Sequence, residues 1–399
     1  MLAYIGAPFY FGACALILIY LIKWITACCG SRNSKPLNII VSVIFILLAA
    51  TPILAFFWPV SPVRRLLSIT GYFWFAVFIY ALMITVLFGI ITFIVKKAKK
   101  VPKHTPVFSR RVKILAGTLA LALILGVSLY GSFHAKDIKT REFSTQIPKT
   151  CQTADKLNVV LISDIHLSAS IGPESVKDMV SVINSMDPDI VCVAGDIFSN
   201  DFDEISDPAA VAANFRDIKS TYGVYACYGN HDVDEPILAG FTFSGSKKHP
   251  LSDPRMDKLV KDSGMILLRD EVTTAGKDIY IIGRRDFEKS GTKDGSRKSI
   301  SQLTSGLDKK KPVILLDHEP SDLEEEAKAG IDLVLAGHTH NGQFFPLTLA
   351  RNIIWDHVDG VKKNDDMTAA VTSGSGYFGP AVRVGSNSEV VKITVSFVK

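Results

Sequence analysis

Five short motifs in the C-terminal part of the chain combine histidine with carboxylate and amide side chains. In chain order they are Asp164-Ile165-His166, Gly195-Asp196, Gly229-Asn230-His231-Asp232, the single residue His318, and Gly337-His338-Thr339-His340. Imidazole nitrogen, carboxylate oxygen and amide oxygen are protein ligands of divalent metals. Five of the chain's nine histidines lie in these motifs, which favours a shared metal site over unrelated structural histidines.

Each motif taken alone has an ordinary explanation. Asp164 can cap a helix, Asp196 and Asn230 fit turns, and His318 fits a loop. What the motifs share is their position, because each follows directly on a predicted β-strand. In open α/β sheets, ligands bind at the carboxyl ends of the strands. We therefore expect the five motifs to converge on one metal site.

The elements that must position these motifs alternate from about residue 140 onwards. The predicted strands are Asn158–Ser163, Ile190–Ala194, Gly223–Tyr228, Ile279–Ile282, Val313–Leu316 and Leu333–Ala336, with further strand-like sequence over Met367–Val398. The predicted helices are Glu174–Met186 and Ser321–Ala329. Asp234–Asp257 and Lys289–Lys311 have the composition of surface insertions. The alternation predicts an α/β domain over residues 140–399, preceded by a membrane domain over residues 1–135.

The N-terminal part has the composition of a membrane region. Hydrophobic residues make up 48% of the chain, and four uncharged stretches each reach the length of about 20 residues that a membrane-spanning helix needs. They are Leu2–Ile22, Leu37–Val60, Leu66–Val95 and Ile114–Phe133. Stretches this long between basic loops favour four transmembrane helices over buried core helices or a cleaved signal peptide. Because they contain no charged residue, we expect an anchor rather than a transporter.

The distribution of Lys and Arg between the short loops predicts the orientation. The loops after the first and third spans together carry eleven basic residues, whereas the loop between the second and third spans carries only Arg64 and Arg65. Loops rich in Lys and Arg stay in the cytoplasm. The pattern therefore predicts a multi-pass protein of the cell membrane, with its C-terminal domain on the extracytoplasmic side.

The net charge of +5 conceals an uneven distribution. Residues 1–139 hold 15 of the 44 Lys and Arg and a single acid, Asp137, so the rest of the chain holds 29 basic and 38 acidic side chains. A C-terminal domain with an excess of acids argues against nucleic acid as a partner. The six cysteines form neither a disulfide framework nor a zinc-ribbon spacing.

With these motifs in this order, the C-terminal domain resembles the calcineurin-like metallophosphoesterases. That family has Asp-x-His, Gly-Asp, Gly-Asn-His followed by Asp or Glu, a lone His, and Gly-His-x-His, and all five parts are present over Asp164–His340. The string from Gly337 to Gln343 is most similar to the bacterial membrane-tethered branch, which usually has Gly where this chain has Asn341. That branch also tends to end with a Gly-rich turn followed by a sequence similar to Pro380–Arg383.

The resemblance implies a four-layer αββα sandwich that holds two divalent metal ions, which are Mn, Fe or Zn. It implies that Asp196 bridges the two ions and that His231 acts on the substrate, with Asp232 orienting it. The ligands implied for the first ion are Asp164, His166 and His340, and those implied for the second are Asn230, His318 and His338. Two ions about 3.5–4 Å apart can hold a hydroxide and clamp the phosphoryl oxygens during in-line attack.

Together, the sequence and the resemblance predict an integral-membrane dimetal phosphoesterase. This hydrolase would cleave a phosphoester, phosphodiester or pyrophosphate bond. The expected substrate is a phosphorylated small molecule or a lipid-linked phosphate, because the membrane region holds the domain close to membrane lipids. The alternative is a non-catalytic membrane sensor or scaffold that retains the metal-binding fold. The presence of His231 beside a full set of ligand residues counts against that alternative.

Overall fold

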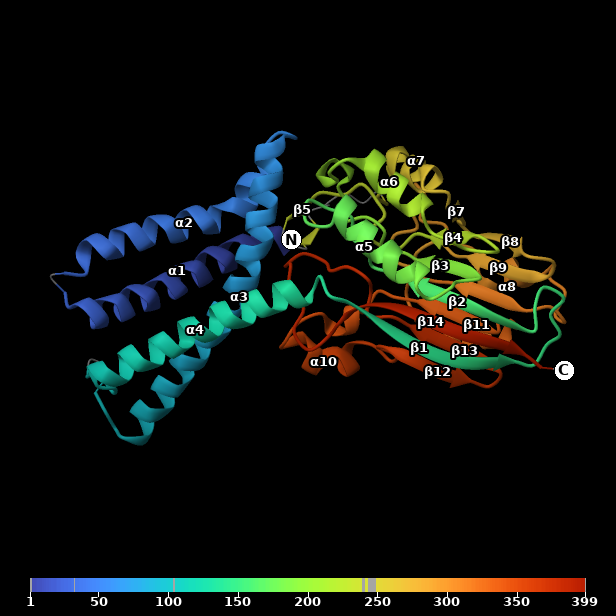
Figure 1. The fold of residues 1–399 in the computed structure, drawn as a ribbon. Coiled ribbons are helices and arrows are strands. Elements are labelled where there is room, and N and C mark those ends of the chain that lie inside the picture. Colours follow the sequence, from blue (N-terminus) through green and yellow to red (C-terminus); the bar gives the residue numbers. More distant parts are fainter. Residues whose placement is uncertain (1, 32, 103–104, 239–240, 243–248, 399) are drawn as a thin grey trace. The chain divides into compact units, whose positions relative to one another are not determined.

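The computed structural model describes residues 2–31, 33–102, 105–238, 241–242 and 249–398. Within the predicted insertion Asp234–Asp257, residues 239–240 and 243–248 lie outside the described residues. The chain forms two compact units, one made mainly of residues 1–132 and the other mainly of residues 133–399 (Figure 1).

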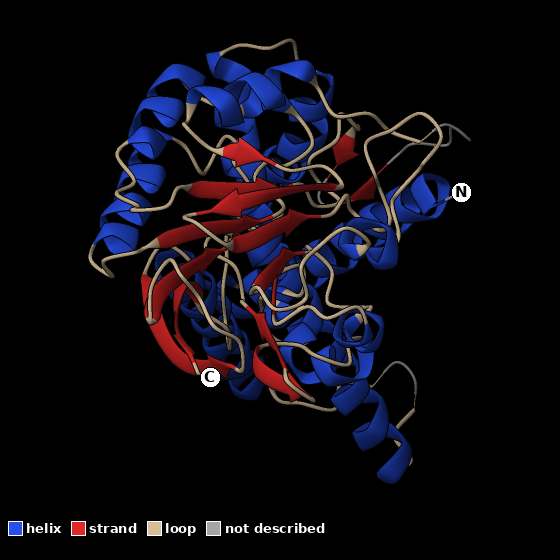
Figure 2. Ribbon diagram, turned by 90° about the vertical axis from the view of Figure 1, so that its right-hand side faces the viewer, coloured by secondary structure: helices blue, strands red, loops and turns tan. Residues whose placement is uncertain are grey.

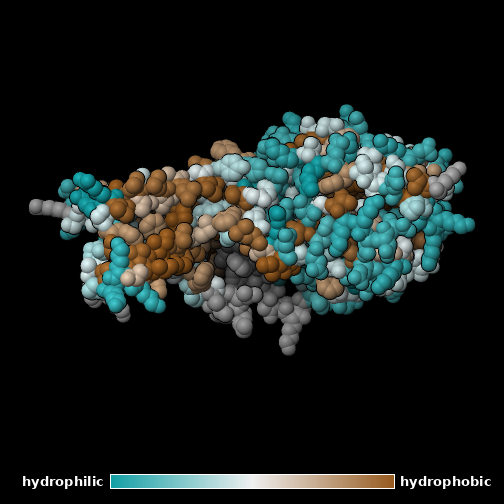
Figure 3. Space-filling model, turned by 90° about the horizontal axis from the view of Figure 1, so that it is seen from below, coloured by the Kyte–Doolittle hydropathy of each residue, from teal (hydrophilic) through white to brown (hydrophobic). Residues whose placement is uncertain are grey.

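Four helices make up most of the first unit. They are α1 (Leu2–Cys29), α2 (Lys35–Phe57), α3 (Pro62–Ala98) and α4 (Arg110–His134). Each is long and apolar enough to cross a membrane, so the four predicted spans are confirmed as helices. Figure 3 shows hydrophobic residues gathered over this unit and mostly hydrophilic ones over the second.

Polar contacts join these apolar helices. The Trp74 indole donates to the Tyr10 hydroxyl over 2.8 Å, and this hydroxyl donates to the Ala49 carbonyl over 2.7 Å, so that one hydroxyl connects α1, α2 and α3. Arg110 at the start of α4 donates to the Ala27 carbonyl in the last turn of α1 over 2.6 Å. Carbonyls in the last turn of a helix have no partner within the helix, and this side chain supplies one.

Two mixed six-stranded sheets form the second unit. The first has the order β1-β14-β2-β3-β4-β7 and the second the order β12-β13-β11-β10-β9-β8. The strands of the first sheet are β1 (Ile138–Ile147), β14 (Ser388–Phe397), β2 (Lys156–Ile162), β3 (Ile190–Ala194), β4 (Val224–Cys227) and β7 (Ile266–Leu267). Those of the second are β12 (Gly360–Asn364), β13 (Met367–Val371), β11 (Leu333–Ala336), β10 (Val313–Leu316), β9 (Ile279–Gly283) and β8 (Glu271–Ala275). A separate pair consists of β5 (Ile237–Leu238) and β6 (Phe241–Thr242).

The two sheets face each other across the main hydrophobic core. Leu161 and Cys192 of the first sheet pack there with Ile281 and Leu335 of the second. The helices on the side of the first sheet are α5 (Pro173–Asn184), α6 (Pro208–Arg216) and α7 (Pro254–Asp262), and those on the side of the second are α8 (Ile300–Thr304) and α9 (Leu323–Lys328) (Figures 1 and 2). These layers confirm the predicted αββα sandwich.

The predicted segment Lys289–Lys311 needs a correction. It is not only a surface insertion, because it contains the short helix α8. Ile300 and Leu303 of this helix are buried in a second core cluster beneath the outer face of the second sheet. The predicted helices that became α5 and α9 are confirmed.

Candidate metal centre

The seven predicted metal ligands lie at the carboxyl ends of strands from both sheets. Asp164 and His166 follow β2, Asp196 follows β3 and Asn230 follows β4 in the first sheet, and the remaining ligands follow the second sheet's strands β10 and β11. Because the sheets pack face to face, their strand ends open onto one region. The prediction that distant motifs would come together is borne out in this geometry.

The backbone around the ligands is strained. Five of the seven adopt the left-handed conformation: Asp164 with φ 52°, His166 with φ 53°, Asp196 with φ 50°, His338 with φ 71° and His340 with φ 48°. That conformation costs a non-glycine residue roughly 1–2 kcal/mol. Strain of this kind persists where the surrounding structure enforces it and is concentrated at functional sites.

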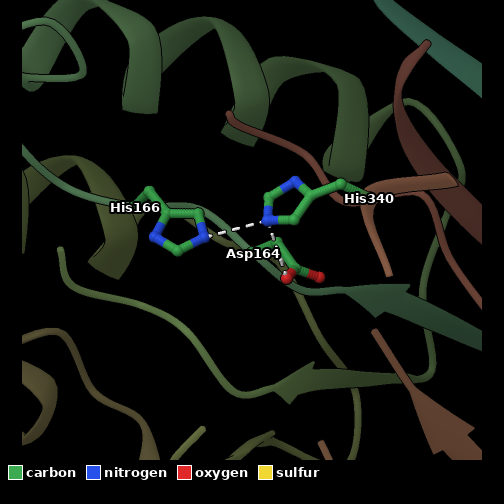
Figure 4. Close-up of side chains that lie close together, drawn as sticks. All are labelled: Asp164, His166 and His340. Atoms are coloured by element: carbon green, nitrogen blue, oxygen red, sulfur yellow. Dashed lines mark hydrogen bonds and ion pairs between the residues drawn. The ribbon is translucent and has the colours of Figure 1, made fainter. Parts of the chain in front are cut away.

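Asp164, His166 and His340 form the first cluster of ligand atoms (Figure 4). Nε2 of His340 lies 3.1 Å from Nε2 of His166 and 3.3 Å from Oδ1 of Asp164. Oδ2 of Asp196 is 3.7 Å from the same nitrogen of His166. The two imidazoles and the carboxylates thus converge on one point, as the ligands of a single ion would.

The second cluster shares Asp164 with the first and adds Asp196 and His318. Oδ2 of Asp196 lies 3.1 Å from Nε2 of His318, and Asp164 belongs to the same group of ligand atoms. Nδ1 of His338 lies 3.3 Å from Oδ1 of Asn230. The rings of His318 and His338 are 5.2 Å apart between centroids. The same carboxylate oxygen of Asp196 therefore faces His166 on one side and His318 on the other, which is the arrangement of a bridging ligand.

Two motif glycines leave the space in which the ligands meet. A Cβ on Gly337 would lie 2.1 Å from Oγ of Ser163 and 2.2 Å from Oδ2 of Asp164. A Cβ on Gly229 would lie 2.4 Å from Oδ1 of Asp196. Glycine at these positions allows the backbone to approach the carboxylates.

Burial determines the protonation of most side chains in the clusters. It lowers the pKa of His166 to about 3 and that of His338 to about 4, and it raises the pKa of Asp164 to about 6. Burial also opposes the charges of Asp196 and His318. Their mutual attraction outweighs it, holding the pKa of Asp196 well below its ordinary value and that of His318 well above. Metal binding requires neutral imidazoles and ionised carboxylates, so it must displace the proton of His318.

This donor set fits a pair of divalent ions. Nδ1 of His318 donates to the Ala194 carbonyl over 2.8 Å, which leaves Nε2 as the ligating nitrogen. That Nε2 is buried and faces the Asp196 carboxylate oxygen 3.1 Å away, so the two atoms can bind the same ion. Histidine with aspartate and asparagine suits Mn, Fe or Zn.

His231 lies beside the clusters and is held by Asn200. Its Nδ1 is 2.5 Å from Oδ1 of Asn200, and its backbone carbonyl accepts a hydrogen bond from the Asn200 amide over 3.0 Å. The His231 amide donates to Oδ1 of Asp196 over 2.8 Å. An amide side chain carries both a donor and an acceptor, so Asn200 can fix the ring plane in either tautomer. Burial lowers the pKa of His231 to about 4.

The contacts of Asp232 correct one prediction. Asp232 does not orient the His231 ring. Its Oδ1 accepts a hydrogen bond from the Phe198 amide over 2.8 Å, and its Oδ2 accepts one from the Gly229 amide over 2.7 Å. The side chain is fully buried. Asp232 therefore ties the loop after β3 to the loop after β4, and the ring is positioned by Asn200.

Phe378 covers one side of His231. Its ring centroid lies 4.2 Å from that of His231 and 5.0 Å from that of His166. Gln343 holds the Phe378 backbone by two hydrogen bonds, both of 2.9 Å: Nε2 of Gln343 donates to the carbonyl, and the Phe378 amide donates to Oε1. No sequence motif indicated a role for Gln343, Phe378 or Asn200. Gln343 ends the string that carried the resemblance, and Asn200 lies four residues after Asp196.

Arg383 is fully buried behind the first cluster. Its guanidinium donates to the carbonyls of Ser373 over 2.6 Å, Gly376 over 2.7 Å and His340 over 3.3 Å. Burial lowers the pKa of Arg383 to about 10, so the group stays charged near neutral pH. It thereby fixes the backbone of His340, a predicted metal ligand, against the glycine-rich segment.

The geometry agrees with a comparison of the sequence with known families. Residues 157–342 match the family described as calcineurin-like phosphoesterase, a range that contains all five motifs and the strands that position them. The second unit is therefore a calcineurin-like metallophosphoesterase domain, a class of metal-dependent phosphoester hydrolases. The bacterial membrane-tethered branch stays a prediction. Asn341, where that branch usually has Gly, has a φ of 52°, a conformation that asparagine adopts more readily than most residues.

Three relatives show how far the similarity extends. The chain is 27% identical over 379 residues to a "Transmembrane protein with metallophosphoesterase domain" of Danio rerio, covering 92% of this chain and 83% of the relative. It is 26% identical over 275 residues to "Uncharacterized metallophosphoesterase Cj0846" of Campylobacter jejuni, covering 68% of each chain. It is also 26% identical over 284 residues to "Uncharacterized metallophosphoesterase YkoQ" of Bacillus subtilis, covering 68% of this chain and 96% of the relative. The first similarity includes the membrane region.

Proposed function

We propose that the chain is a membrane-anchored phosphoesterase that uses two divalent ions to hydrolyse a phosphoester, phosphodiester or pyrophosphate bond, with a lipid-linked phosphate as its substrate. The observation that carries the proposal is the convergence of seven ligand residues from both sheets, with His231 beside them. A sensor or scaffold would need the metal ligands but would not need a second residue to fix the plane of His231.

We divide the ligands between the two ions as the family resemblance implies. One ion would be held by Asp164, His166 and His340, the other by Asn230, His318 and His338, and Asp196 would contact both. When bound, such a pair of ions lowers the pKa of a water molecule and neutralises charge on the phosphoryl oxygens.

His231 is the side chain that would act on the substrate directly. Asn200 binds its Nδ1, which leaves Nε2 to meet the leaving oxygen or a phosphoryl oxygen. Proton transfer or hydrogen bonding by a positioned histidine typically contributes about 10²–10⁴-fold to the rate. Phe378 restricts the ring from one side, so the nitrogen keeps its position when the substrate binds.

The point at which the anchor joins the domain supports a lipid-linked substrate. Only Ala135–Asp137 separate α4 from β1. Oγ of Ser388 donates to the Ala135 carbonyl over 2.7 Å and lies 3.5 Å from the Gly376 carbonyl. The Gly376 amide donates to the carbonyl of the metal ligand Asp164 over 2.9 Å. Ala135, the first residue after α4, is therefore linked to the backbone of Asp164 through Ser388 and Gly376.

The basic loops support an extracytoplasmic position of the domain. A cysteine-reactive reagent that cannot cross the membrane tests this on intact cells. In a variant with a cysteine introduced at the exposed residue Lys328, the reagent should label the chain without permeabilisation. Labelling that requires permeabilisation would place the domain in the cytoplasm and overturn this part of the proposal.

Hydrolysis of bis-p-nitrophenyl phosphate and p-nitrophenyl phosphate by the purified full chain tests the activity. The protein would be stripped of metal and then supplied with Mn²⁺, beside His231→Ala and Asp196→Ala. Turnover that returns with the metal and is lost in both variants is the expected result. Two bound ions per chain without turnover on these esters or on a vesicle-borne ester would support the scaffold instead.

A further inference from the structure

The helix α10 (Leu347–Ile354), labelled in Figure 1, is amphipathic with its apolar side turned away from the protein. At 3.6 residues per turn, its residues divide into two continuous arcs. The apolar arc consists of Leu347, Leu349, Ala350, Ile353 and Ile354, and the polar arc consists of Thr348, Arg351 and Asn352. Leu349 is 72% exposed, Ile353 88% and Ile354 54%, and no residue of the helix is buried.

The polar arc provides the contacts that fix this orientation. Arg351 donates to Oδ1 of Asn341 over 2.6 Å, next to the metal ligand His340. Thr348 packs against two glycines: a Cβ on Gly342 would lie 2.9 Å from its Cα, and a Cβ on Gly385 would lie 3.3 Å from its Oγ1. The helix is thus held by its polar side, which keeps its apolar side outward.

Other helices of the same domain are arranged in the ordinary way. The helix α5 buries Val176, Met179, Val180 and Ile183. Amphipathic helices of globular proteins normally turn the apolar side to the core. The reversed arrangement of α10 is the one that an amphipathic helix takes when it lies in a membrane interface.

The start of α10 lies close to the point where the chain leaves the membrane. Gly385, which Thr348 contacts, is two residues from Asn387, a span of at most about 7 Å along the chain. Oδ1 of Asn387 lies 3.0 Å from Nε2 of His134, the last residue of α4. The helix itself is about 12 Å long. Because His134 belongs to the same unit as α10, these contacts place the start of α10 near the last residue of α4.

We propose that α10 is an interfacial anchor whose apolar arc inserts at the boundary between headgroups and acyl chains of the bilayer that holds the chain's own helices. Trp355 caps the C-terminal end of α10, and its ring centroid lies 6.4 Å from that of His338, one of the proposed metal ligands. Insertion of the helix thereby holds the metal centre at the level of lipid phosphates. This second statement rests on the proposed function, whereas the insertion itself does not.

Fluorescence quenching tests the insertion without any activity. The full chain would be reconstituted in phosphatidylcholine vesicles after replacement of the cysteines that are not buried, Cys28, Cys29 and Cys151, by alanine. A bimane label would be placed on Ile353→Cys or on the matched control Asn352→Cys, which lies on the polar arc of the same helix. Lipids brominated in their acyl chains should quench the label at position 353 at least twofold more than the label at position 352. Equal quenching at the two positions would overturn the insertion.

A comparison of two substrates tests what the insertion does. Ile353→Asp should lower kcat/KM about tenfold or more for a p-nitrophenyl phosphodiester carrying a hexadecyl chain in vesicles, because a charge replaces an aliphatic side chain that the proposal places in the bilayer. Its kcat/KM for water-soluble bis-p-nitrophenyl phosphate should stay within twofold of the parent. Asn352→Asp, which adds the same charge to the polar arc, should change neither. Equal losses on both substrates would overturn a role in lipid access.

Two other results have distinct meanings. If the parent hydrolyses neither ester, the proposed function fails, while the quenching experiment still decides the insertion. A second copy of the chain could instead cover the apolar arc. In that case the bimane label at position 353 would be protected from water only at a high ratio of protein to lipid, and Ile353→Asp would convert a dimer to a monomer. That pair of results would show that the membrane proposal is wrong.

Discussion

Asn200→Ala is the perturbation that most sharply separates the chemistry of His231 from metal binding. The substitution removes the side chain that lies 2.5 Å from Nδ1 of His231. It keeps the hydrogen bond from the amide of residue 200 to the His231 carbonyl, so the backbone of the histidine stays in place. None of the seven predicted metal ligands is altered.

The expected loss follows from the bond that is removed. A hydrogen bond to a group that carries charge contributes about 1.5–3 kcal/mol, and His231 becomes charged when it holds the proton that it moves. Each 1.36 kcal/mol corresponds to a factor of ten in rate, so kcat should fall by about 10- to 150-fold. KM should change little, because Asn200 is not expected to bind the substrate.

The assay is the steady-state hydrolysis of bis-p-nitrophenyl phosphate by the full chain with Mn²⁺, together with the metal content of the same sample. Asn200→Asp, which keeps an acceptor oxygen at the same place, should recover most of the activity. Two metal ions per chain should remain bound in both variants. An Asn200→Ala protein with wild-type kcat, or one that has lost its metal, would refute the positioning role.

Three further perturbations test other parts of the site and fold. Gly337→Ala should prevent metal binding and lower the free energy of unfolding by about 1–3 kcal/mol, because its Cβ would lie 2.2 Å from Oδ2 of Asp164. Metal content and chemical denaturation measure the two effects. An unchanged metal content would contradict the steric clash. Gln343→Ala should lower kcat without loss of metal, because it removes both hydrogen bonds that hold Phe378 beside His231. An unchanged kcat would count against that role. Asp278→Asn should lower the melting temperature at pH 7 and flatten its decline in acid. Burial opposes the ionisation of Asp278, but the hydrogen bonds that its carboxylate accepts outweigh burial and lower its pKa. The ionised side chain therefore stabilises the fold above the pKa of Asp278 in the unfolded chain, and this stabilisation is lost as the pH falls through the lower pKa of the folded state. A melting temperature that declines in acid as steeply as in the parent would contradict this.

The central strands were predictable because they are buried on both faces. The runs at Ile190–Ala194, Val313–Leu316 and Leu333–Ala336 are wholly apolar and end at turn residues, and their bounds agree with β3, β10 and β11. The strand β1 was missed because it is an edge strand of the first sheet, and only three of its ten residues, Ile138, Phe143 and Ile147, are apolar. It begins at Ile138, two residues before the predicted domain boundary.

The convergence of the predicted ligands could be anticipated because each motif lies within a few residues of a strand end. The positioning residues could not, since their roles arise from contacts between distant parts of the chain: Asn200 meets His231, and Gln343 meets Phe378. Adjacency suggested Asp232 as the partner of His231, but its carboxylate is taken by backbone amides. The orientation of α10 was likewise hidden, because a sequence shows that a helix is amphipathic but not which side faces the protein.

The most direct test of the central claim is a titration of the metal-free full chain with Mn²⁺, in which turnover of bis-p-nitrophenyl phosphate is followed against the number of ions bound per chain. We predict that turnover stays low until the second ion binds and then rises to its maximum at two ions, and that Asp196→Ala, which removes the shared ligand, never reaches it. Full turnover with one ion, or turnover by metal-free protein, would contradict a two-metal phosphoesterase.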